Sequence, residues 1–161
     1  MGEWVGEYPG VSQIDCMYRE ADKLYHEVAK DCGLSDCAYW MLYEVIRSEG
    51  EVSMAELAET WSFSRQTISS AVKSLESAGY VTCSFASGSR KRKVVRLTEA
   101  GRAFGDQKIV PAMEAEHRAF DSLPADERRE LLRLVEKYTH AIDAELGALC
   151  ARSAGGEVVV R

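Results

Sequence analysis

Features typical of membrane, secreted and disulfide-bonded proteins are absent from this chain of 161 residues. No stretch approaches the roughly 18–20 consecutive apolar residues of a membrane span. The N-terminus lacks the basic region and the apolar run of a signal peptide. These absences predict a cytoplasmic protein without a membrane partner, and its five cysteines are then expected to be free thiols rather than a disulfide framework.

Motifs of the common enzyme and metal-site classes are missing as well. The sequence contains no GxSxG, Walker A or GxGxxG motif, no CxxC pair, and no HxxxH or HExxH pair. Glu114, Glu116 and His117 could contribute to a metal site, but their positions fit a solvated helix surface better. We therefore predict a protein that is not an enzyme and that holds neither a metal nor a cofactor.

Positive charge is concentrated in one segment of an acidic chain. The formal net charge is −6. Residues 62–97 carry seven Lys or Arg and one acid, Glu76, which gives a local charge of +6 and leaves −12 for the remainder. A basic patch on an acidic body predicts that nucleic acid binds at one surface and is repelled elsewhere.

Residues 64–79 have the pattern of an amphipathic helix. The apolar positions recur at i, i+3, i+4 and i+7 and so share one face: Ile68, Ala71, Val72 and Leu75. Ser64 can cap the first turn, and Gly79 suits the left-handed position after the last turn. The opposite face has no carboxylate and carries short hydrogen-bonding side chains. Such a face is suited to phosphates and base edges.

A β-hairpin with a basic tip is predicted next. Residues 80–85 alternate with the period of a half-buried strand, 92–98 form the returning strand, and Ser87-Gly88-Ser89 is a turn signal. A capping box, Ser53-Met-Ala-Glu56, starts a short helix to about residue 61. The short helix, the polar-faced helix and the basic hairpin together predict a winged helix-turn-helix domain.

Helices are predicted on both sides of this domain. Helical stripes cover 12–32 and 35–50, and a long helix at 99–120 should kink near 107–108 because of Pro111. After Pro124, an apolar seam continues over about four heptad-like turns. Because the winged domain has its own core, these helices should bury their stripes on each other or on a second copy of the chain.

The predicted fold is mainly α with a small β-hairpin wing. Its expected organisation is an irregular N-terminal arm (1–11), a helical dimerisation region (12–50 and 99–150), a winged helix-turn-helix DNA-binding domain (51–98) and a flexible tail (151–161).

From about residue 12 to 149 the chain resembles the MarR family of bacterial transcriptional regulators. The segments that carry the resemblance are Met54-Ala-Glu-Leu-Ala-Glu, Ser64-Arg-Gln-Thr-Ile-Ser-Ser-Ala-Val-Lys-Ser-Leu-Glu-Ser-Ala-Gly-Tyr-Val and Val94-Val-Arg-Leu-Thr-Glu-Ala-Gly. The resemblance implies a homodimeric winged-helix regulator, usually a repressor, that is often released from its operator by a small ligand or by oxidation. Two recognition helices about 34–36 Å apart would read a pseudo-palindrome in double-stranded DNA.

Candidate DNA contacts lie on the polar-faced helix and at the hairpin tip. They are Ser64, Arg65, Gln66, Thr67, Ser69, Ser70 and Lys73 on the helix, and Ser89, Arg90, Lys91, Arg92 and Lys93 at the tip. We assign Ser64 and Thr67 to phosphates, and Gln66 and Ser70 to base edges. Where the family's wing usually has an Asp, this chain has Ser89, so a looser tip is expected. Arg90 is favoured over Lys91 for the minor groove, because a weakly hydrated guanidinium suits a narrow groove.

Two regulatory sites are considered. An aromatic group could line a cleft for a small aromatic effector, although core packing would also explain it: Tyr25, Tyr39, Trp40 and Tyr43. Cys16 lies near the position where peroxide-sensing members of the family place a reactive thiol, and Cys37 follows a helix start that could lower its pKa. The alternatives to a ligand-controlled regulator are a thiol-based redox sensor and a winged-helix protein-interaction module without DNA binding.

Overall fold

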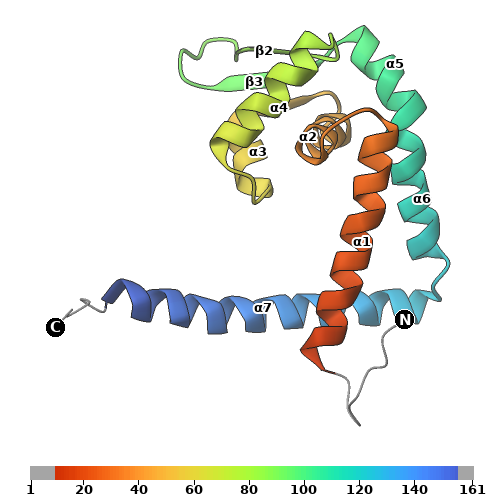
Figure 1. The fold of residues 1–161 in the computed structure, drawn as a ribbon, viewed down its shortest axis with the longest axis vertical. Coiled ribbons are helices and arrows are strands. Elements are labelled where there is room, and N and C mark those ends of the chain that lie inside the picture. Colours follow the sequence, from red (N-terminus) through yellow and green to blue (C-terminus); the bar gives the residue numbers. More distant parts are fainter. Residues whose placement is uncertain (1–9, 156–161) are drawn as a thin grey trace. The chain divides into compact units, whose positions relative to one another are not determined.

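The computed structural model describes residues 10–155 (Figure 1). Its helices are α1 (Val11–Asp31), α2 (Asp36–Arg47), α3 (Met54–Thr60), α4 (Arg65–Ser77), α5 (Glu99–Lys108), α6 (Val110–Asp121) and α7 (Ala125–Gly155), and its strands are β1 (Glu51–Ser53), β2 (Val81–Phe85) and β3 (Lys93–Leu97). The predicted mainly helical fold with a small wing is confirmed. Most of the predicted arm at 1–11 lies outside the described residues, and Val11 already belongs to α1.

Two compact units make up the chain, Met1–Met113 and Glu114–Arg161. The first contains α1 to α5, the start of α6 and the three strands, and the second contains the rest of α6 and α7. All elements of the winged helix-turn-helix therefore belong to one unit, together with α1 and α2. None of the helices in the described part combines the length and the apolar character needed to cross a membrane.

The sheet is antiparallel and has the strand order β1-β3-β2. β2 and β3 form the predicted hairpin, with Cys83 opposite Val95. β1 pairs with the other edge of β3, with Val52 opposite Val95, and leads directly into α3. β1 was not predicted from the sequence, because three residues are too few to reveal an alternating pattern.

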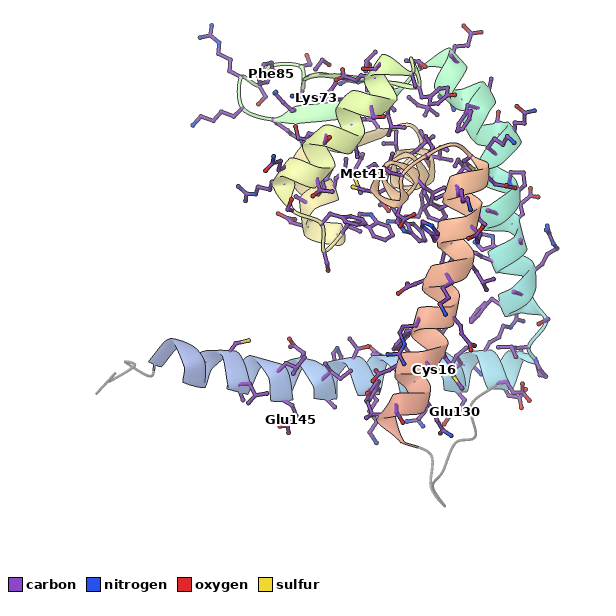
Figure 2. All side chains as sticks on the ribbon, viewed as in Figure 1. Cys16, Met41, Lys73, Phe85, Glu130 and Glu145 are labelled. Atoms are coloured by element: carbon purple, nitrogen blue, oxygen red, sulfur yellow. The ribbon has the colours of Figure 1, made fainter. Side chains whose placement is uncertain are left out.

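The core of the first unit is centred on α2. This helix buries Cys37, Ala38, Tyr39, Met41, Leu42, Glu44 and Val45. Met41 lies among the side chains that fill the space between α2 and α4 (Figure 2). The four apolar positions predicted on α4 are all buried, as expected. Ala58 on α3 is half-buried, and so is Trp61, which follows the end of α3 at Thr60 and has extended backbone angles.

The break between α5 and α6 lies at Ile109, close to the kink predicted near 107–108. Pro111 has no N–H, so it cannot donate to the carbonyl four residues earlier in a continuous helix. At the other end of the chain, the predicted tail is wrong for residues 151–155. There α7 continues to Gly155 because Ala151-Arg-Ser-Ala contains no strong helix breaker. Residues 156–161 lie outside the described part.

Hydrogen bonds around Thr98 hold the end of the wing against the end of α4. The Thr98 hydroxyl accepts the N–H of Gly101 at 2.9 Å and lies 2.6 Å from the carbonyl oxygen of Gly79, to which it donates. The Thr98 N–H donates to the carbonyl of Tyr80 at 3.0 Å. A Cβ on Gly101 would lie 1.8 Å from that same Tyr80 oxygen. Glycine is therefore required for α5 to approach this backbone so closely.

We expect Gly101→Ala to lower the free energy of unfolding by about 3 kcal/mol or more, because backbone atoms cannot move aside. Gly105→Ala on the same helix is the matched control. A Cβ there would meet Cδ1 of Ile46 at 2.6 Å, and this flexible side-chain end can move, so the expected cost is under about 1 kcal/mol. Urea unfolding followed by circular dichroism measures both variants. Equal losses would show that the approach to Tyr80 does not set the requirement for glycine.

Candidate nucleic-acid interface

The helix-turn-helix consists of α3 and α4, joined by residues 61–64. The predicted capping box at the start of α3 is confirmed. The N–H of Ser53 donates to Oε2 of Glu56 at 2.7 Å, and the N–H of Glu56 donates to Oγ of Ser53 at 3.1 Å. This bond from the Ser53 backbone lowers the pKa of the Glu56 carboxyl, and Arg92 adds a smaller effect in the same direction. Glu56 therefore stays ionised and keeps α3 in place.

The start of α4 is capped by Ser64, as predicted. Its Oγ accepts the N–H of Thr67 at 3.1 Å and lies 2.7 Å from Oγ1 of Thr67. The two side chains assigned to phosphates therefore share a hydrogen bond. One hydroxyl hydrogen of the pair is used in that bond, so the other remains available to a phosphate oxygen.

The outward face of α4 presents most of the predicted contacts. Arg65, Gln66, Thr67, Ser70 and Lys73 are exposed, whereas Ser69 is half-buried. The first turn of α4 contains no acidic residue. Lys73 follows two turns after the cap and stands on the side of α4 that α2 does not cover (Figure 2). This face can therefore approach a polyanion without a repelling carboxylate.

Glu76 is the acid closest in sequence to this face, and its carboxylate is used within the fold. Oε1 of Glu76 accepts the N–H of Cys83 at 2.8 Å, which connects the last turn of α4 to β2. The single acid of the basic segment thus fixes the wing relative to α4.

The wing tip is a tight turn followed by a side-chain cap. The N–H of Ser89 donates to the carbonyl of Ala86 at 3.0 Å, and Gly88 takes the positive φ of 73° that such a turn requires. Oγ of Ser89 then accepts the N–H groups of Lys91 (3.2 Å) and Arg92 (2.9 Å). The expected loosening of the tip is therefore corrected, because the side chain of Ser89 caps the turn by accepting two backbone N–H groups.

The cations of the wing differ in how far their charge is already compensated. Arg92 lies 3.8 Å from Glu56, and the Nζ of Lys93 lies 5.7 Å from the ring centroid of Phe85. Arg96, on β3, is bound to Glu51 at 2.5 Å and to Ser84 at 2.9 Å. Among residues 10–155, neither Arg90 nor Lys91 has an acidic partner, and both are exposed. Of the wing cations, these two are the least compensated.

An aromatic cluster surrounds Trp40. Its ring lies 4.7 Å from that of Tyr25 and 4.6 Å from that of Trp61, with which it stacks. A hollow of about 290 Å³ beside it is lined by Asp22, Tyr25, His26, Asp36, Trp40 and Phe63. The structure thus brings Tyr25 and Trp40 of the predicted cleft to one wall. Tyr39 is fully buried, and neither it nor Tyr43 is among the residues described as lining the hollow.

Four of the lining residues were not predicted from the sequence: Asp22, His26, Asp36 and Phe63. Nδ1 of His26 lies 2.9 and 3.1 Å from the two carboxylate oxygens of Asp36, so this pair connects α1 to α2. The i, i+3, i+4 spacing of Asp22, Tyr25 and His26 places them on one helical face and was the available signal. The contact of His26 with Asp36 depends on the packing of α1 against α2, so the spacing of residues along the sequence does not indicate it.

The cysteines do not support the predicted activation of Cys37. This residue is 6% exposed, and burial raises the pKa of its thiol, opposite to the lowering expected from the helix start. Desolvation outweighs the helix terminus because the sulfur is turned into the core. Cys16 is half-buried, and its Sγ lies 4.0 Å from Oε1 of Glu20. In the described part of the chain, no three His, Cys, Asp or Glu residues gather as a metal site would require.

Comparisons with known proteins agree with this geometry. A family model described as MarR family matches residues 33–92. NicR of Pseudomonas putida, an HTH-type transcriptional repressor, is 30% identical over 120 residues, which cover 74% of this chain and 75% of NicR. NMB1585, a MarR family regulator from Neisseria meningitidis, has a similar fold, with a TM-score of 0.72 at 18% identity over 88% of this chain and 99% of that one. The DNA binding of BpsR from Bordetella bronchiseptica is regulated by 6-hydroxynicotinic acid. Its structure gives a TM-score of 0.63 at 17% identity and covers 86% of this chain and 98% of BpsR.

We expect Cys37 to react with iodoacetamide more slowly than Cys150 at mildly alkaline pH. Burial both blocks access to Cys37 and raises its pKa, so little thiolate forms, whereas Cys150 is exposed. Mass spectrometry of a time course gives the rate at each residue, and the two rates should converge in urea. Faster labelling of Cys37 in the folded protein would contradict the direction of its pKa shift.

Proposed function

Because this chain belongs to the MarR family of transcriptional regulators, we propose that it is a homodimeric repressor that binds a pseudo-palindromic operator and loses affinity when a small ligand binds. Members of this family are regulators rather than enzymes. The proposal rests on two observations together: an outward α4 face without carboxylates, and wing-tip cations that have no acidic partner within residues 10–155. A DNA-binding regulator must reach the chromosome. The cytoplasmic location stays a prediction.

In this proposal α4 is the recognition helix and lies in the major groove. Gln66 and Ser70 are exposed and would reach base edges, since an amide can bond adenine through two hydrogen bonds. Thr67, with the free hydroxyl hydrogen of the Ser64 pair, would bond a phosphate, as would Arg65. Lys73 lies two turns further along and would contact the backbone of the same groove.

The wing would supply the second set of contacts. Arg90 would enter the minor groove, where a narrow groove attracts a guanidinium. Lys91 and Lys93 would lie near phosphates, and the Ser89 hydroxyl would keep the tip turned toward them. Arg92 would have to give up part of its pairing with Glu56 to reach DNA, so we assign the wing contacts first to Arg90 and Lys91.

A second copy of the chain is proposed because apolar side chains remain exposed in both units. On α7 the following are between 37% and 59% exposed: Leu131, Leu132, Leu134, Val135, Ile142, Leu146 and Leu149. On α1, Met17, Tyr18 and Leu24 are more than half exposed. Side chains of this kind rarely remain in water over such a length, so each unit has a face that a second copy can cover.

Repression and ligand control are proposed from the relatives. NicR is a repressor, and BpsR binds DNA under the control of a small aromatic acid. In a dimer, a ligand would reduce affinity by favouring a separation of the two recognition helices that does not fit successive major grooves. Of the two thiols considered for redox control, Cys16 and Cys37, the first remains the candidate, since the pKa of Cys37 is raised. A protein-interaction module without DNA binding is the remaining alternative.

We expect Arg90→Ala to weaken binding to operator and random duplexes by similar factors, and to reduce the slope of log K against log salt by about 1. Arg19→Ala, which removes an exposed arginine from α1, is the control and should leave the slope unchanged. Fluorescence anisotropy over a salt series measures both variants. An unchanged slope for Arg90→Ala would remove this residue from the interface. No salt-dependent binding by the wild type would favour the protein-interaction module.

We expect Ile142→Glu to convert dimers to monomers, because it places a charge at the centre of the apolar seam of α7. Ala144→Glu introduces the same side chain on the opposite face of α7 and should leave the dimer intact. Analytical ultracentrifugation separates the two states, since one chain has a mass of 17.9 kDa. A wild-type protein with the mass of one chain would contradict the homodimer.

A further inference from the structure

The hollow beside Trp40 is the one with aromatic walls among those described in the first unit. Two larger hollows, of about 400 and 380 Å³, have no aromatic ring in their described linings. At about 290 Å³, the aromatic hollow lies just below the usual range of small-molecule pockets, which is roughly 300–1,000 Å³. Its size suits a ligand with a single ring.

Three elements contribute to this pocket. Asp22, Tyr25 and His26 come from α1, Asp36 and Trp40 from α2, and Phe63 from the connection between α3 and α4. The Trp40 ring lies 4.7 Å from that of Tyr25 and stacks with that of Trp61 at 4.6 Å, and Trp61 stacks with Phe63 at 6.4 Å. The rings are thus fixed by their neighbours before a ligand arrives. The faces of such rings attract cations.

The lining of the pocket is negatively charged, which also favours a cationic ligand. Asp22 and Asp36 are both carboxylates, and the described lining contains no Lys or Arg. His26 is bound to Asp36, and even a protonated His26 would compensate one carboxylate and leave the other. Within residues 10–155, Asp22 has no hydrogen-bond or ion-pair partner. The pocket is therefore negative in either state of His26, and an anion would be repelled.

We propose that this pocket binds a small aromatic cation, such as an aryl-substituted amine or quaternary ammonium. A carboxylate like that of 6-hydroxynicotinic acid, the regulator of BpsR, would be disfavoured here. The ring of the ligand packs against Tyr25, Trp40 and Phe63, and its positive group lies beside Asp22. The regulatory consequence rests on the proposed function. Phe63 directly precedes Ser64, the cap of α4, so an occupied pocket adjoins the start of the recognition helix.

Three matched probes test the charge preference: benzyltrimethylammonium, benzyl alcohol and benzoate. They are titrated into a Trp4→Phe variant of the full chain, in which Trp40 and Trp61 are the remaining tryptophans, and intrinsic fluorescence reports binding. We expect the cation to bind about tenfold more tightly than the neutral probe, and benzoate to bind most weakly. Equal or tighter binding of benzoate would overturn the proposal without any further substitution.

Substitutions then locate the charge. Asp22→Asn should weaken binding of the cation about fivefold to tenfold and leave benzyl alcohol unchanged. Asp15→Asn, the same change at an exposed position on α1 outside the pocket, should affect neither probe. Loss of affinity in both variants, or in neither, would contradict a role of Asp22 as the counter-charge.

DNA binding is measured separately, by anisotropy of genomic fragments with and without the cation. Selective binding of the cation by a protein that binds no DNA would support the pocket and overturn the proposed function. DNA binding together with equal binding of all three probes would support the proposed function and overturn the cation pocket. Release of DNA by benzyltrimethylammonium but not by benzoate supports both.

Discussion

Packing of the apolar face of α4 on α2 determines where the proposed DNA contacts of this helix lie. Ile68, Val72 and Leu75 are at most 2% exposed, and the side chains that α2 adds to the same core, among them Met41 and Leu42, are completely buried. Each fully buried side chain of this size contributes about 1.5–3 kcal/mol. Because the helix has only one apolar face, burying it fixes the rotation of α4 about its axis. The same rotation turns Gln66, Ser70 and Lys73 outward, so no contact of their own is needed to orient them.

The acidic composition of the chain is compatible with a basic surface because nearby carboxylates serve the fold. Glu76 accepts the N–H of Cys83, Glu51 binds Arg96, and Glu56 accepts the N–H of Ser53. Each of these acids lies close to the proposed interface, yet each is directed at a backbone or side-chain partner. The positive potential of the region is therefore left to Arg90, Lys91 and the cations of α4. Net charge alone would have given the wrong sign for the partner.

Local patterns predicted the helix-turn-helix because its signals lie within a few residues of each other. Ser53 and Glu56, or Ser64 and Thr67, are three residues apart, and the burial of α4 follows from a period of 3.6. The missed features depend on contacts between distant segments. β1 is defined by its pairing with β3, and His26 and Asp36 meet because two helices pack together. Burial of Cys37 and the capping of the tip by Ser89 likewise required the fold. The identity of an effector cannot be predicted from single residues for the same reason.

The helix α2 is shared by the aromatic pocket and by the proposed DNA-binding surface. Trp40 forms a wall of the pocket, while its neighbours Tyr39 and Met41 face the core against which α4 packs. A second connection runs from Trp40 through the stacked Trp61 and Phe63 to Ser64. A ligand can change DNA affinity only as far as it binds two arrangements of these elements unequally. In the proposed regulation, the two arrangements would differ in the contacts of Trp40 or Phe63, since these side chains line the pocket and contact Trp61 or adjoin Ser64. A close-packed core allows few such alternatives, so a small displacement at the pocket would be carried to the recognition helix rather than absorbed.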